Sequence, residues 1–176
     1  MPPLGTPELD KLFCLFGKKY GLPKLVLKAI GIRESSLMQG AYRFEPNFWE
    51  RYCKNNPKWK DKDPAQVSAS WGIMQLMYVV ASELGFEGTG EELCNPVINI
   101  ELGAKLLRLH LDEVIKDKIV EKFIWLSPLQ IICCRYNGGE GGNPNDKGIL
   151  RKQTYYDGVK REWDELKKKE SECDEL

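Results

Sequence analysis

The chain has almost no histidine and no long hydrophobic run, and each shortage excludes a class of protein. His110 is the only histidine, and no C-x-x-C pair accompanies it, so the sequence implies no zinc site, no other metal and no cofactor. No apolar segment reaches the ~18 residues that a membrane-spanning helix needs. Residues 1–5 lack the basic start and the apolar block of a secretory leader, so we expect no signal peptide.

An excess of charge of either sign is also lacking. The 26 basic and 26 acidic residues cancel, which argues against a general nucleic-acid binder. Hydrophobic residues make up 42% and charged residues 30% of the chain, as in typical globular domains. The sequence contains no repeat, linker or low-complexity segment, so we expect one domain over residues 1–176, acting as a monomer.

The even number of cysteines is compatible with three disulfides, but two observations favour free thiols instead. Cys133 and Cys134 are adjacent in an apolar stretch, and a chain of this length does not need a disulfide framework for stability. We therefore expect buried free thiols at the six cysteine positions, which are Cys14, Cys53, Cys94, Cys133, Cys134 and Cys173.

Hydrophobic periodicity predicts a mainly α-helical fold. Helices are expected to begin at Thr6-Pro7, at Pro23, at Asn95-Pro96 and at Ser127-Pro128, because a capping residue or a proline opens each of them. A further helix is expected from about residue 70 through Leu84, and a last one over 155–169, before a charged tail at 167–176. In the helix after Asn95 the apolar stripe is Ile98, Leu102, Leu106 and Leu109. Strand signals are weak, and a small hairpin within residues 40–70 is the most that they support.

Glu34 lies at the C-terminal end of the predicted helix 23–36, whose apolar residues surround nearly its whole circumference. A carboxyl group held against apolar surface loses solvation when it ionises, so its pKa rises. The partial negative charge of a helix C-terminus acts in the same direction. Glu34 is therefore a candidate general acid. The alternative is a solvated helix-end glutamate with no special role.

Four segments resemble, in the same order along the chain, the motifs of the lysozyme-like lytic transglycosylases, the soluble lytic transglycosylase catalytic-domain family. Residues 32–36 (IRESS) resemble the family's Glu-Ser segment, and 72–77 (GIMQLM) resemble its Gly-Leu-Met-Gln segment. Residues 95–107 (NPVINIELGAKLL) are similar to its Asn-Ile helix, and 135–139 (RYNGG) to its Tyr-Asn-Gly turn.

This resemblance implies a helical lysozyme-like fold with a glycan-binding groove, and peptidoglycan glycan strands as the partner. It implies cleavage of the β-1,4 bond between N-acetylmuramic acid and N-acetylglucosamine, with a 1,6-anhydromuramoyl product. Glu34 would first protonate the leaving oxygen and then accept the proton of the attacking 6-hydroxyl. The enzyme would act at the cell wall, in the periplasm or outside the cell, and release from the cytoplasm like a phage-type lysin is one route to it.

The resemblance also carries over a set of groove residues. Tyr136 would place its hydroxyl near Glu34, and Gly72 would let the backbone approach the saccharide closely. Met74 fits either the groove or the core. The residues expected to bind substrate are Ser36, Ser70, Gln75, Met77, Tyr136 and Asn137.

The chain departs from the family in the long spacing between Glu34 and Gly72, which leaves an aromatic-rich insert over about residues 40–64. Glu45 lies in this insert. If it faced Glu34, it could hold a water for direct hydrolysis, as in goose-type muramidases, with the two carboxyl groups ~6.5–9.5 Å apart. Otherwise it is a structural partner of Arg43. A third hypothesis is a non-catalytic glycan-binding or phage structural module. Among the aromatic residues, Tyr42, Trp49 and Trp71 could line subsites, whereas Phe44 and Phe48 are expected to pack internally.

Overall fold

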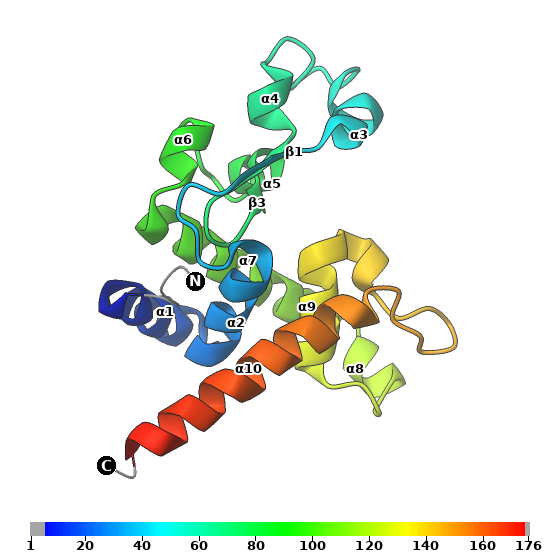
Figure 1. Ribbon diagram of the computed structural model, residues 1–176. Coiled ribbons are helices and arrows are strands. Elements are labelled where there is room, and N and C mark those ends of the chain that lie inside the picture. The colour runs from blue at the N-terminus through cyan, green and yellow to red at the C-terminus, as the bar shows by residue number, and fades with distance from the viewer. Residues whose placement is uncertain (1–5, 175–176) are drawn as a thin grey trace.

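The structure is a computed structural model that describes the backbone of residues 6–174 and the side chains as far as Glu170. Most of the chain is helical, in two parts (Figure 1). The larger part contains α1 (Pro7–Tyr20), α2 (Lys24–Ser35), α7 (Pro96–Lys116), α8 (Ile119–Lys122), α9 (Pro128–Gly138), the 3₁₀ turn η2 (Gly139–Gly142) and α10 (Gln153–Asp174). The smaller part contains β1 (Tyr42–Phe44), α3 (Pro46–Phe48), the π-helical turn η1 (Trp49–Cys53), α4 (Pro64–Val67), β2 (Ala69–Trp71), β3 (Leu76–Met77), α5 (Tyr78–Glu83) and α6 (Gly90–Leu93).

The starts of the long helices follow the capping signals in the sequence. The side chains of Thr6, Asn95 and Ser127 each accept a hydrogen bond from a backbone N–H in the first turn, and a proline follows each of them. Gly21 ends α1 in the left-handed conformation, at φ 64°. The predicted starts of α1, α2, α7 and α9 are thus confirmed, whereas α10 begins two residues earlier and ends five residues later than the predicted 155–169.

Helix α2 lies in the hydrophobic core, as its all-round apolar pattern predicts. It packs against α1 on one side and α10 on another (Figure 1). Val26, Leu27, Ala29 and Ile30 are fully buried there. Its last residues before the left-handed cap at Ser36 are therefore held in a fixed position, and Glu34 is one of them.

The predicted helix from residue 70 through Leu84 is wrong in its first half. Residues 69–77 form the hairpin β2–β3, in which Ser70 pairs with Met77 and Trp71 with Leu76, and the helix α5 begins only at Tyr78. Strand β1 pairs antiparallel with the other edge of β2 and completes a three-stranded sheet. Helical backbone cannot continue here because Gly72 (φ 73°) and Gln75 (φ 46°) both adopt left-handed conformations.

The buried face of α7 also differs from the predicted stripe. Leu109 is exposed, and Ile98, Leu102 and Leu106 are only half-buried. The buried positions are instead Asn99, Ile100, Gly103, Ala104, Leu107, His110 and Val114. A stripe chosen by hydrophobicity misses this face because the face includes Asn99 and Gly103, a polar and a small residue that both contact Met74 of the hairpin.

The insert shares a second, small hydrophobic cluster with α4 and α5. Cys53, Trp59, Val67 and Val79 are buried together, and Phe48 packs against them as predicted. Phe44 does not pack internally; its side chain is 40% exposed on β1, so that prediction is wrong. The short helices α4, α6 and α8 were not predicted, because a turn or two of helix leaves no periodic pattern to detect.

The described cysteines are all free thiols as predicted; Cys53, Cys133 and Cys134 are also buried as predicted, whereas Cys14 and Cys94 are only half-buried. The side chain of Cys173 lies outside the described side chains. Burial raises the pKa of Cys134 to about 11, so its thiol stays protonated. Over residues 6–174, no helix is both long and apolar enough to cross a bilayer.

Candidate active site

A cleft of about 770 Å³ lies where the smaller part of the fold meets α7 and α9. One wall comes from the insert and the hairpin, and the other from α7, α9 and the turn after α9. Seven of the eight residues predicted for the site line this cleft, and they are Glu34, Glu45, Ser70, Gln75, Met77, Tyr136 and Asn137. Ser36 is not among the lining residues; it is the exposed left-handed cap of α2.

The Glu34 carboxyl group is half-buried in the cleft and accepts a hydrogen bond from one tyrosine. The hydroxyl of Tyr155, at the start of α10, donates a hydrogen bond of 2.6 Å to Oε1 of Glu34. Burial raises the pKa of Glu34 above its ordinary value, against the opposing effects of the Tyr155 hydrogen bond and of the positive charges of Arg43 and Arg33. The carboxyl group therefore holds its proton to higher pH than a solvated glutamate does.

Two tyrosines lie near Glu34, Tyr155 and Tyr136, and their hydroxyl groups have different hydrogen-bond partners. Burial and the neighbouring Glu34 carboxylate raise the pKa of Tyr155, so that its hydroxyl remains a donor throughout the neutral range. Tyr136 is close enough for the charge of Glu34 to contribute to raising its pKa as well, although burial is the larger cause. Its hydroxyl, however, donates to the backbone oxygen of Met74 at 2.8 Å rather than to Glu34. The tyrosine that donates a hydrogen bond to Glu34 is therefore Tyr155, a residue that the sequence did not identify.

The β2–β3 hairpin is fixed by polar side chains from three helices. Ser35, next to Glu34, donates from Oγ to the oxygen of Ile73 at 2.8 Å. Buried Asn99 on α7 accepts from the N–H of Met74 at 2.7 Å and donates to the oxygens of Trp71 and Leu93. Tyr136 on α9 supplies the third contact. All four motif segments therefore meet at the hairpin turn, which positions it relative to the acid.

Gly72 has a structural role that differs from the predicted one. A Cβ atom on Gly72 would lie 2.5 Å from Nδ2 of Asn99, so the space beside this glycine is filled by an amide and not by saccharide. Gly72 is also absent from the residues that line the cleft. Met74 is fully buried, and its side chain packs where Gly103 leaves room, so the core interpretation of Met74 is the correct one.

Gln75 reaches the cleft from the strained turn. Its amide nitrogen donates to the backbone oxygens of Ala41 (3.2 Å) and Gly72 (3.0 Å). Within the described residues its amide oxygen has no partner, so it can accept a hydrogen bond from a ligand in the cleft. Ser70 and Met77 face each other across the hairpin, with the Ser70 hydroxyl 3.3 Å from the Met77 sulfur.

Glu45 lines the cleft but is ion-paired. Its Oε1 lies 2.6 Å from Nε of Arg43, the structural alternative considered for this residue. Ser68 holds the backbone of Glu45 through two hydrogen bonds. The Ser68 hydroxyl donates to the backbone oxygen of Glu45, and the backbone oxygen of Ser68 accepts from the N–H of Glu45 at 2.8 Å. Because the charge of Arg43 also acts on Glu34, this guanidinium influences both carboxyl groups of the cleft.

A polar cluster occupies the α7–α9 wall of the cleft. Nη2 of buried Arg135 donates to Glu113, which also lies 3.4 Å from Nδ1 of His110. Burial lowers the pKa of His110, and the charge of Arg135 adds to the effect. Since Arg135 is already paired with a carboxylate, this cluster is balanced in charge and gives the cleft no strong preference for anions.

The aromatic residues proposed for subsites lie elsewhere. Tyr42 packs on Trp71 with ring centroids 4.6 Å apart, and Trp49 packs against the insert cluster. None of the three is among the residues that line the cleft; the lining aromatic side chains are Phe48, Tyr52 and Tyr136.

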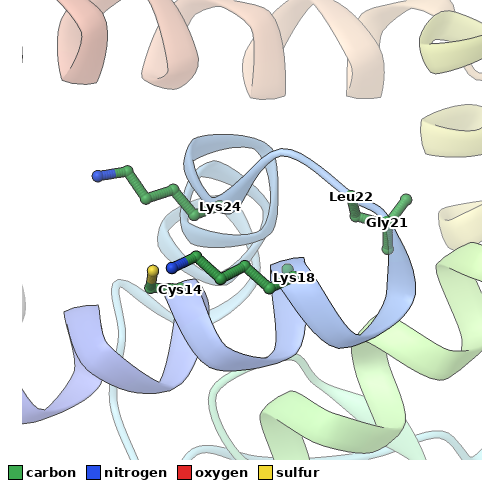
Figure 2. Close-up of a pocket in the computed structure, with 6 residues that line it drawn as sticks. Cys14, Lys18, Gly21, Leu22 and Lys24 are labelled. Atoms are coloured by element: carbon green, nitrogen blue, oxygen red, sulfur yellow. The ribbon is translucent and has the colours of Figure 1, made fainter.

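A second pocket, of about 280 Å³, lies at the turn between α1 and α2. Figure 2 shows the Lys18 and Lys24 side chains extending in the same direction, with the Cys14 thiol near them. Its lining offers ammonium groups and a thiol but no carboxyl group, whereas the larger cleft contains Glu34 and Glu45.

Comparison with known proteins agrees with this geometry. The mostly helical fold is consistent with a lysozyme-like domain. Residues 12–157 match the family model of the transglycosylase SLT domain, and the chain therefore belongs to that family. Searches of curated proteins and of solved structures returned no significant match. Family membership supports a transglycosylase-type activity on peptidoglycan, at the cell wall.

Proposed function

We propose that the protein is a lytic transglycosylase that cleaves the β-1,4 bond between N-acetylmuramic acid and N-acetylglucosamine, with Glu34 as its catalytic residue. The observation that carries the proposal is the Glu34 carboxyl group, which is desolvated in the cleft and hydrogen-bonded to Tyr155. A raised pKa lets this group arrive protonated, as a general acid must. The products would carry a 1,6-anhydromuramoyl end.

One carboxyl group suffices for both steps of this reaction. Glu34 gives its proton to the leaving glycosidic oxygen as that bond breaks. The carboxylate then accepts the proton of the muramoyl 6-hydroxyl while the 6-oxygen attacks the anomeric carbon. Tyr155 donates to the same Oε1 in either protonation state and stabilises the ionised one more, because hydrogen bonds to charged groups are stronger.

The neighbouring groups of the cleft fit glycan recognition. Gln75 lines the cleft, its amide oxygen has no partner among the described residues, and Asn137 is exposed at the end of α9. Amides of this kind bond hydroxyl and N-acetyl groups of sugars. We include Ser70, Met77 and Tyr136 in the substrate-binding wall, and leave Ser36 out because it does not reach the cleft.

Substitution of Glu34 by Gln tests the proposal, because it keeps the shape of the side chain and removes the transferable proton. We expect the rate of turbidity loss of a peptidoglycan suspension to fall by ~10²–10⁴-fold. Glu50→Gln is the matched control, because Glu50 pairs with Lys54 on the insert surface and does not line the cleft. Circular dichroism would verify that both variants are folded. Wild-type activity in the Glu34 variant would refute the assignment.

Direct hydrolysis is the second candidate, because Glu45 lines the same cleft and its backbone is anchored by Ser68. Its ion pair with Arg43 is the argument against it. Mass spectrometry of the released muropeptides separates the two reactions: anhydro ends indicate transglycosylation, whereas reducing ends indicate hydrolysis. Binding to peptidoglycan with no soluble product would favour a non-catalytic glycan-binding module over both.

A further inference from the structure

An exposed apolar tip lies apart from the cleft-lining residues, formed by Ile124, Trp125 and Ile149. These side chains are 83%, 65% and 58% exposed, and Ile124 is the most exposed large hydrophobic residue described. Single exposed apolar residues are common on protein surfaces, but three large ones together on a protruding edge call for an explanation.

The tip is one surface although its residues come from two segments. A Cβ atom on Gly148 would lie 2.6 Å from the Trp125 ring and 3.1 Å from the Phe123 ring, so the loop before α10 packs directly on the segment after α8. The Phe123 and Trp125 rings contact each other with centroids 5.7 Å apart. Figure 1 shows α8 and this loop projecting at the same end of the molecule.

Basic residues outnumber acidic ones in the two segments that contribute to the tip. Residues 115–125 and 145–151 contain five exposed basic residues and three exposed acidic ones, a net charge of +2 in a chain whose total is zero. Among the described residues, none of these eight forms an ion pair. The basic residues are Lys116, Lys118, Lys122, Lys147 and Arg151. Their charges are therefore available to an anionic partner.

We propose that this tip docks on the surface of a bilayer that contains anionic lipids. Trp and Ile side chains enter the boundary between headgroups and acyl chains, while the lysines of the same segments contact the anionic headgroups. An anionic wall polymer could form ion pairs with the lysines, but it has no apolar surface to cover Ile124. A second protein copy fits less well, because three side chains expose on the order of 400 Å², about half of what each partner buries in a standard interface.

Docking at the tip would not use the cleft. None of the three apolar residues lines the cleft, and neither does any of the five basic residues of the two segments. The proposal therefore stands or falls independently of the catalytic assignment of Glu34, and its test needs no glycan.

Sedimentation with lipid vesicles tests the proposal on the full chain. We expect the protein to sediment with vesicles of equal parts phosphatidylglycerol and phosphatidylcholine, much less with pure phosphatidylcholine, and less again at high salt. Because Trp125 enters a less polar environment, tryptophan emission should shift to shorter wavelength on binding.

Variants at exposed positions locate the contact. Ile124→Ser and, separately, Ile149→Ser should each weaken vesicle binding by at least about tenfold. Leu15→Ser is the matched control, because Leu15 is 56% exposed on α1, outside the tip, and its loss should change nothing. The proposal is overturned if mixed vesicles bind no protein, if the two isoleucine variants bind as wild type does, or if Ile124→Ser abolishes a self-association of the free protein.

Discussion

Removal of the Tyr155 hydroxyl should change both the rate and the pH dependence of peptidoglycan cleavage. Tyr155→Phe deletes the donor 2.6 Å from Oε1 of Glu34 and leaves the ring, which is buried against the core. A hydrogen bond to an ionised group contributes about 1.5–3 kcal/mol, whereas one to a neutral group contributes about 0.5–1.5 kcal/mol. The loss should therefore favour protonated Glu34 over its ionised form by roughly 1 kcal/mol, about fivefold in their ratio.

The sign of the effect follows from the present role of Tyr155. Its hydrogen bond lowers the pKa of Glu34 against the larger upward effect of burial, so its loss raises that pKa further. The alkaline limb of the pH–rate profile, which reports loss of the proton from Glu34, should move to higher pH. Because the acid is also held less firmly, we expect the rate at the optimum to fall by about tenfold.

The assay is the initial rate of turbidity loss of purified peptidoglycan, measured across a range of pH at constant ionic strength. Tyr156→Phe is the matched control, because Tyr156 is the next residue of α10 and its hydroxyl interacts with Ser127 rather than with Glu34. An alkaline limb that does not move in Tyr155→Phe, with a reduced rate or without it, would refute the reasoning and leave Tyr155 as a packing residue.

Three further predictions concern stability and mechanism. Since burial raises the pKa of Glu34 in the folded state, wild-type stability should fall as pH rises above the ordinary value of 4.5, and urea unfolding should find Glu34→Gln increasingly more stable than wild type toward neutral pH. Asn99→Ala removes three hydrogen bonds to buried backbone groups of the hairpin region and should lower the free energy of unfolding by ~3 kcal/mol or more. Glu45→Gln should reduce the rate less than ~10-fold if cleavage is transglycosylation, and ~10²-fold or more if Glu45 positions a hydrolytic water.

The sequence predicted the long helices well because their signals are local. Caps such as Thr6 and Asn95 lie within a turn of the residues that they bond, and α2 is long and apolar enough to be recognised as a core helix. The hairpin was missed because its cause is not local. Residues 72–77 are apolar enough to suggest a helix, and their backbone is fixed by contacts with distant residues, among them Asn99, 27 positions beyond Gly72.

The site was predicted in part for the same reason. The resemblance brought Glu34, Gln75 and Tyr136 together correctly, since these residues belong to the motifs. It could not assign the hydrogen bond of Tyr155, which is 121 positions from Glu34 and reaches it only because α10 packs across α2. Nor could it show that the hydroxyl of Tyr136 donates to the backbone oxygen of Met74 in the hairpin and not to Glu34.

The position of the hairpin relative to Glu34 does not depend on side-chain hydrogen bonds from the insert that forms the outer wall of the cleft. Ser35, Asn99 and Tyr136 join the turn to α2, α7 and α9 without using any side chain of residues 46–64. We expect that this stretch can be exchanged while Glu34 and Gln75 keep their relative position, provided that its replacement still covers Val67 and Val79 as Cys53 and Trp59 do. Grafting this stretch between members of the family would then test whether it sets the glycan preference.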